Sequence, residues 1–157
     1  MTARGTTIAQ IEATLPRGLH DAYLEAVEID WVNARLVLSA RVMDSENQDM
    51  DRRAKTTVTG LVFCAIDPTE IDRGRRYDPT PDAGLWVDSG EGPADEAKAK
   101  LPEVPAGCFL QWFFVKEWNR FIHVCGKHAE LTWTEDAPVA ARATTRALFP
   151  GETIDLP

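Results

Sequence analysis

The chain has 157 residues, of which 44% are hydrophobic and 27% are charged, a composition typical of one soluble globular domain with its own core. Its formal net charge of -8 argues against nonspecific nucleic-acid binding, which needs a basic face, and it favours solubility or a basic partner. No apolar run is long enough to span a bilayer and the first residues lack the pattern of a secretory signal, so we expect a cytoplasmic protein.

The first third of the chain predicts a short helix followed by a β-hairpin. Within residues 6–15 apolar side chains recur at helical spacing, and Pro16 ends the pattern. Residues 22–31 then alternate, with apolar side chains mostly at odd positions, which favours a strand whose odd face is buried. Residues 35–43 also alternate, and the Asn-Ala pair at 33–34 suits the turn between the two strands because Asn tolerates positive φ.

The middle of the chain combines one strand with a long connection. Residues 44–53 are polar, and residues 55–66 are rich in the β-branched side chains that favour a third strand. Residues 67–107 hold six of the ten prolines, and a connection of this length in a compact domain is often functional or mobile. Within it, residues 85–87 predict a short strand, and residues 93–101 predict a short helix that begins with a proline.

The strongest β pattern comes near the end of the chain. Two largely apolar runs at residues 108–118 and 121–133 predict a hairpin with a two-residue loop at 119–120. In the register that this loop imposes, Lys116 lies opposite His123.

A glycine in the second of these runs, Gly126, suggests a bulge. The alanine-rich tail at residues 137–157 predicts a short helix or coil packed on the sheet. We therefore expect a single domain that is mainly β, or α+β, with an antiparallel sheet of about five to seven strands, curled or sandwiched, and one to three short helices.

The dipeptide His20-Asp21 is the first candidate site, because a carboxylate can orient an imidazole and tune it as a base. However, adjacent residues of an extended chain point to opposite sides. The structural alternative is that Asp21 accepts backbone N–H bonds in the turn at Gly18, where the strand begins. We favour this alternative, since a His-Asp dipeptide alone is not a catalytic triad.

The second candidate consists of His123, Cys125 and His128. The first two share one face of a strand, and a bulge would bring His128 near them, as a zinc site requires. The spacing matches no usual zinc motif, and Lys116 opposite His123 would repel a cation. We predict no metal and no cofactor, and inert thiols at the three cysteines, which have apolar neighbours.

Acidic and aromatic residues supply the remaining candidates. Glu25 lies on the apolar face of its strand. If it is buried there, it needs a cation such as Arg41 or Lys116, or a raised pKa. We favour a position at the strand end where the side chain reaches water. The chain also has five tryptophans, including Trp86, which either fill the core or form an exposed patch for a ligand or partner.

A short motif precedes and enters the first predicted strand: Leu19-His20-Asp21-Ala22, followed by Leu24, Val27 and Asp30. It resembles the start of small bacterial proteins of unknown function, some of which look like immunity proteins of polymorphic toxin systems. The resemblance spans about the first 40 residues. It implies a β-rich protein that binds another protein without catalysis, and no catalytic residues carry over from it.

These observations leave two hypotheses of different class. The first is a non-catalytic protein, monomeric or homodimeric, that binds a protein partner with a basic surface. Its candidate binding residues are His20, Asp21, Glu25, Trp86, Lys116 and His128. The alternative is a small enzyme or ligand binder with a β-barrel-like fold and a histidine-containing pocket. Its candidate catalytic residues are His20, Asp21 and His123. Convergence of two histidines and an acid in one pocket would distinguish the two.

Overall fold

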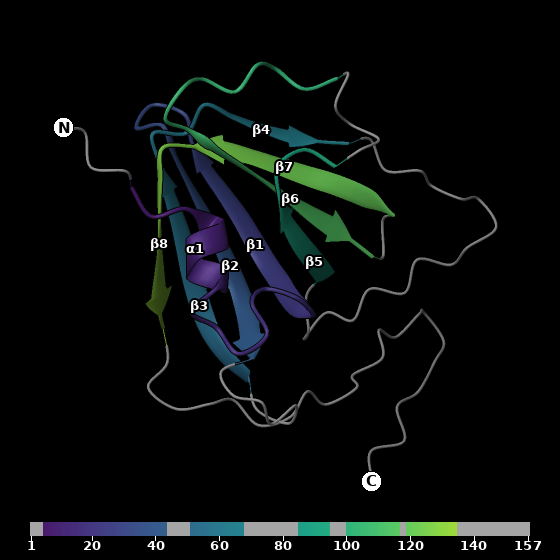
Figure 1. The fold of residues 1–157 in the computed structure, drawn as a ribbon. Helices are drawn as coiled ribbons and strands as arrows, with labels where there is room; N and C mark the ends of the chain where they lie inside the picture. Colours follow the sequence, from purple (N-terminus) through teal and green to yellow (C-terminus); the bar gives the residue numbers. More distant parts are fainter. Residues whose placement is uncertain (1–4, 44–50, 68–84, 95–99, 117–118, 135–157) are drawn as a thin grey trace, which may run out of the picture.

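The computed structural model describes residues 5–43, 51–67, 85–94, 100–116 and 119–134. In this part of the chain one antiparallel sheet of eight strands accompanies one short helix, which confirms the expected mainly β fold (Figure 1). The elements are α1 (Ile8–Glu12), β1 (Ala22–Asp30), β2 (Arg35–Met43), β3 (Asp51–Thr59), β4 (Phe63–Ile66), β5 (Leu85–Glu91), β6 (Phe109–Val115), β7 (Arg120–Gly126) and β8 (His128–Trp133). No helix among these residues is long and apolar enough to cross a membrane.

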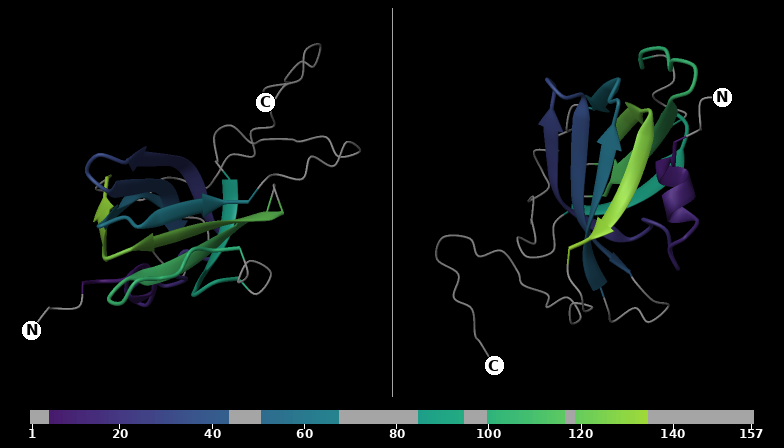
Figure 2. Two further views of the ribbon diagram at one scale, coloured as in Figure 1. Left: turned by 90° about the horizontal axis from the view of Figure 1, so that it is seen from above. Right: turned by 90° about the vertical axis from the view of Figure 1, so that its left-hand side faces the viewer.

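The strands follow the order β4-β7-β6-β5-β1-β2-β3-β8, and every neighbouring pair is antiparallel. The count exceeds the expected five to seven because two predicted strands are each divided by a bend. One bend follows Thr59 and the other lies at Lys127, whose N–H donates to the Thr59 carbonyl at 3.1 Å. Figure 2 shows how the sheet curls as a result.

The apolar core lies on the concave face of this curled sheet. Alternate residues of each strand supply it, as the period of two requires. The helix α1 covers one side through Ile8 and Ile11, and it packs against β8 and β6. A capping box between Thr7 and Gln10 starts this helix. The fully or nearly buried core residues include Leu36, Val42, Val58, Val87, Val115, Ile122, Val124 and Ala129.

The buried face of β1 changes part-way along the strand, which corrects the expectation that its odd positions all face inward. The pairing with β2 shifts at Glu25, which forms a bulge. Before the bulge the even residue Leu24 is buried, and after it the odd residue Val27 packs against the core. An extra residue in a strand reverses which side chains face inward. Trp31, in the following turn, is 65% exposed.

The predicted register of the β6–β7 hairpin is wrong. Trp112 lies opposite His123, and Phe114 lies opposite Phe121. The connection spans residues 116–119, longer than the predicted two-residue loop. Asn119 adopts a left-handed φ of 51° and its N–H donates to the Lys116 carbonyl at 3.3 Å, so Asn119 closes the turn and is not one of its two central residues.

The long connection at 67–107 contains a full strand. β5 extends beyond the predicted residues 85–87 and inserts between β1 and β6. β3 also begins earlier than expected, at Asp51, inside the segment predicted to be a polar connection. The predicted helices at 93–101 and within 137–157 lie largely or wholly outside the described residues.

Candidate functional site

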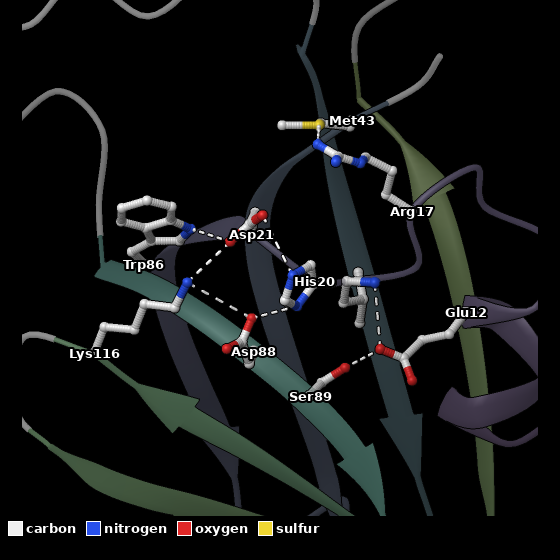
Figure 3. A network of polar contacts seen from close by, with 10 residues as sticks. Glu12, Arg17, His20, Asp21, Met43, Trp86, Asp88, Ser89 and Lys116 are labelled. Carbon is white, nitrogen blue, oxygen red and sulfur yellow. Dashed lines mark hydrogen bonds and ion pairs between the residues drawn. The ribbon is translucent and has the colours of Figure 1, made fainter. Parts of the chain in front are cut away.

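Four predicted site residues meet at one end of the sheet's outer face, together with one that was not predicted (Figure 3). We call this group the polar cluster: His20, Asp21, Trp86, Asp88 and Lys116. The first two precede β1, the next two lie on β5, and Lys116 follows β6. The strand order places β5 between the other two, which is why residues distant in sequence come together.

Asp21 is the centre of the cluster. Its Oδ1 accepts bonds from Lys116 Nζ and from Trp86 Nε1, each at 2.9 Å. The Lys116 ammonium also lies 4.0 Å from the centroid of the Trp86 ring, a cation–π distance. We expected Asp21 to bond the backbone of the Gly18 turn, but these contacts to side chains instead join the start of β1 to β5 and β6.

The two acids enclose an exposed imidazole. His20 Nδ1 lies 2.5 Å from Asp88 Oδ1, and His20 Nε2 lies 3.4 Å from Asp21 Oδ2. The expectation that His20 and Asp21 point apart is wrong, because the backbone between them is not extended. Asp21 has a φ of 59°, a left-handed conformation that turns its carboxylate back towards the imidazole and that Asp tolerates better than most residues.

Two opposing effects act on the pKa of Asp21. Burial raises it, but the bond from Lys116, the charges of His20 and Lys116 and the bond from Trp86 outweigh burial, and the pKa falls below its usual value. Asp88 shares the same ammonium, since its Oδ1 lies 3.7 Å from Lys116 Nζ. The lowered pKa of Asp21 thus comes chiefly from the neighbouring side chains of the cluster itself.

The cluster carries metal-ligating groups, but an ammonium already lies among them. Ligand atoms of His20, Asp21 and Asp88 all lie within 4.8 Å of one another, and no other such group occurs among the described residues. Lys116 lies close to both carboxylates that would hold a divalent ion, and its charge repels such an ion. Within the part of the chain that the structure describes, His20 pairs only with carboxylates and with no hydroxyl or thiol nucleophile.

The other two histidines lie elsewhere. His123 is fully buried on β7, and its Nε2 accepts a bond from the Ala94 N–H at 3.2 Å. Burial lowers the pKa of His123, against the raising effect of the Asp67 charge. His128 instead accepts a bond from the Thr6 N–H at 2.9 Å. The three histidines do not converge, and the described residues do not bring His123 and His128 into one metal-ligating group.

Two of the three cysteines, Cys64 and Cys125, have a thiol with a raised pKa. Cys125 is fully buried on β7, and burial, with a smaller effect of Cys108, raises the pKa of its thiol to about 11. Burial alone raises the pKa of Cys64 to about 11. A thiol with such a pKa is hardly ionised near neutral pH and is a poor nucleophile.

Glu25 belongs to a different part of the outer face. Its Oε1 lies 3.0 Å from Arg41 Nε and 3.3 Å from Arg53 Nε, which confirms Arg41 as a partner. Tyr23 lies directly opposite both Trp86 and Arg41, and Arg41 lies opposite Arg53. We call these four aligned residues the cross-strand row: Trp86, Tyr23, Arg41 and Arg53.

A second polar group lies on the core side of the sheet, under α1. The carboxylate of Glu12 accepts bonds from the Leu19 N–H at 3.2 Å, from Gln111 Nε2 at 3.1 Å and from the Ser89 hydroxyl. Burial raises the pKa of Glu12, and the bonds from Leu19 and Gln111 counteract this only in part. The group anchors the helix to β5 and β6.

Comparison with known proteins identifies no relative of this chain. No family model, no curated protein and no solved structure matches this chain. The resemblance of the first strand to immunity-like proteins therefore stays a prediction.

Sequence reasoning missed Asp88, Glu12 and Gln111. Gln111 gave a usable signal, because it is the one polar residue in the run Phe109–Val115. A polar side chain that is buried in such a strand needs a hydrogen-bond partner, which predicts a second polar residue beside it. Asp88 gave none, since it is one acid among many in a chain with 25 Asp and Glu residues. Its role depends on β5 lying between β1 and β6.

Proposed function

We propose that the chain is a non-catalytic cytoplasmic protein that binds a protein partner through the cross-strand row and the adjoining polar cluster. The observation that carries this proposal is the composition of the row. Trp, Tyr and Arg are the residue types that dominate the binding energy of protein interfaces, and here they occupy directly opposed positions on four neighbouring strands.

The order of these side chains before binding supports the proposal. The rings of Tyr23 and Trp86 are stacked, with centroids 5.9 Å apart and planes 8° apart. Glu25 holds the two arginines, and Asp21 holds the Trp86 indole. Side chains that are already ordered lose less conformational entropy when a partner binds.

The total charge of -8 supports a partner with a basic surface, since opposite net charges accelerate association. In a homodimer, each copy of the chain would face another chain with the same negative net charge, which disfavours association. We therefore place a different polypeptide ahead of a homodimer.

A second candidate function rests on a separate observation. A pocket of about 710 Å³ lies between α1 and β8, and His128, Ile11 and Trp133 are among its lining residues. This volume falls within the range of small-ligand sites, so the chain would then be a small-ligand binder.

The test is native mass spectrometry of the protein purified gently from its own host. We expect an added mass that corresponds to a second polypeptide, lost in the variant Trp86→Ala/Arg53→Ala. The matched control is Trp31→Ala/Arg35→Ala, which removes the same residue types from exposed positions at the other end of the β1–β2 hairpin. The control should retain the partner.

Three other outcomes would contradict the proposal. If the chain is observed alone, it has no polypeptide partner. If both double variants lose the partner equally, the cross-strand row is not the binding site. A small organic molecule in place of a polypeptide favours the pocket between α1 and β8.

A further inference from the structure

A separate pocket of about 380 Å³ lies on the outer face of β5, β6 and β7. Its lining residues are Asp88, Trp112, Phe114, Asn119, Arg120 and Phe121. Asp88 lies opposite Phe114, and Phe114 lies opposite Phe121. The volume is near the lower end of the range for ligand sites and suits one side chain better than a larger molecule.

Three aromatic rings form inclined walls of this aromatic pocket. The Trp112 and Phe121 centroids lie 5.6 Å apart with planes at 84°, and those of Phe114 and Phe121 lie 5.0 Å apart at 51°. The Trp112 ring packs closely over Gly90 on β5, where an added Cβ would clash with the indole. The rings are thus held in place by their neighbours.

Asp88 lines this space, and one of its carboxylate oxygens takes no part in its two ion pairs. Both of its ion pairs, to His20 and to Lys116, use Oδ1. Oδ2 has no hydrogen-bond or ion-pair partner among the described residues, and Figure 3 shows that both contacts to Asp88 are made at the other oxygen. A half-buried carboxylate oxygen beside aromatic faces is complementary to a positively charged N–H donor.

We propose that the aromatic pocket takes the basic side chain of the protein partner, whose cationic head lies against the three rings and donates to Asp88 Oδ2. This inference rests on the proposed function, and it specifies the chemistry of the partner side chain that is the anchor in the pocket. Arg120 also lines the pocket and donates Nη1–H to the Asn119 carbonyl at 3.2 Å. Its charge opposes a second cation, so the head group lies on the Asp88 side.

The test is an NMR titration of the full chain that follows the Trp112 indole N–H. The probes are Nα-acetyl-arginine amide and Nα-acetyl-lysine amide, with the neutral citrulline and norleucine analogues as matched controls. We expect the basic probes to bind with a dissociation constant on the order of millimolar, as a single side chain allows, and the neutral analogues to bind at least about tenfold more weakly.

Two variants locate the site. Asp88→Asn should weaken the basic probes at least about tenfold, but it also alters the polar cluster. Phe121→Leu leaves that cluster intact and removes one ring, and it should weaken the same probes by a similar factor. Trp31→Leu, in the exposed turn far along β1, is the control and should have no effect.

Several results would overturn the inference. Equal affinity for the arginine and citrulline probes would show that the pocket does not distinguish a charged side chain from a neutral one. Binding of Nα-acetyl-aspartate amide in their place would assign the pocket to an anion held by Arg120. No shift with any probe would show that the pocket is closed.

The inference and the proposed function fail separately. If Phe121→Leu retains the captured polypeptide while Trp86→Ala/Arg53→Ala loses it, the pocket is not the anchor and the proposed function stands. If no polypeptide is captured with the wild type or any variant, the proposed function fails. The further inference then fails with it, because no partner supplies a basic side chain to the pocket.

Discussion

Lys116 Nζ lies 2.9 Å from Asp21 Oδ1, which links the end of β6 to the residue that precedes β1. These strands are not neighbours, because β5 lies between them. The ion pair passes over β5 at Trp86, whose indole donates to the same carboxylate oxygen and whose ring lies under the ammonium. One cation therefore ties three strands together.

Replacement of Lys116 should convert the polar cluster into a site for divalent cations. In Lys116→Met the apolar stem is retained, while the three potential ligands His20, Asp21 and Asp88 lose the neighbouring ammonium that pairs with the two carboxylates. We expect the variant to bind Zn²⁺ at least about tenfold more tightly than the wild type, since imidazole and carboxylates are suitable zinc ligands. Isothermal titration calorimetry measures this, and equal affinity would contradict the assigned role of Lys116.

Two substitutions at Asp21 should separate charge from backbone conformation. Asp21→Asn tolerates the left-handed φ of 59° and loses only the charge, at a cost of about 1 kcal/mol. Asp21→Ala adds the cost of a left-handed alanine, about 1 kcal/mol more. Chemical denaturation gives both values, and equal losses would show that backbone strain is negligible at this position.

The stabilisation by Asp21 should depend on pH. Its pKa is lowered from the usual 3.8, so the ionised form is favoured in the folded chain. The contribution is complete above pH 3.8 and is lost as the pH falls through the lowered pKa. The difference in stability between the wild type and Asp21→Asn should therefore shrink on acidification below that pH. A constant difference would argue against the ion pair as its source.

Glu12 should show the opposite pH dependence. Its pKa is raised from the usual 4.5, so its contribution is complete below pH 4.5 and is lost as the pH rises through the raised pKa. Glu12→Gln removes this titration, and its stability relative to the wild type should improve between pH 4 and pH 7. Glu28→Gln, on an exposed position of β1, is the control and should show no such trend.

Removal of the Glu12 side chain should be costly. In Glu12→Ala the amide of Gln111, which is 1% exposed, loses its acceptor, and so does the Leu19 N–H. An unsatisfied buried donor costs about 1–3 kcal/mol, and urea denaturation should show a loss in this range. A change within about 0.5 kcal/mol, the range of ordinary surface substitutions, would mean that water replaces the carboxylate.

Gly90 should be intolerant of side chains because of Trp112. A Cβ at this position would lie 2.3 Å from the indole, so Gly90→Val must displace the ring, at a cost of about 1–3 kcal/mol. The double variant Gly90→Val/Trp112→Leu should recover most of this loss, and a double-mutant cycle measures the coupling. Additive effects would show that the clash is not with Trp112.

His123 should weaken the fold in acid. Burial lowers its pKa from the usual 6.5, so its contribution is complete above pH 6.5 and is lost as the pH falls through the lowered pKa. Protonation of Nε2 also removes the acceptor of the Ala94 N–H. His123→Leu should flatten the dependence of the melting temperature on pH below 6.5. An unchanged slope in His123→Leu would assign the acid sensitivity to other groups.

The sequence by itself determined the elements whose signals are local. Alternation and the turn at 33–34 predicted β1 and β2, whose observed bounds are Ala22–Asp30 and Arg35–Met43. Residue chemistry also selected His20, Asp21, Trp86 and Lys116, since charged and aromatic side chains carry most recognition. The mainly β class followed from the same local patterns.

Only the tertiary structure decided which of these residues meet. The insertion of β5 between β1 and β6 brings Asp88 to Asp21, and strand order is a non-local property that alternation does not encode. The bulge at Glu25 changed which side chains of β1 face the core. The turn closed by Asn119 gave β6 and β7 a register different from the predicted one. Each depends on one residue's backbone angles and pairing, and a shift by one residue reverses every side chain that follows.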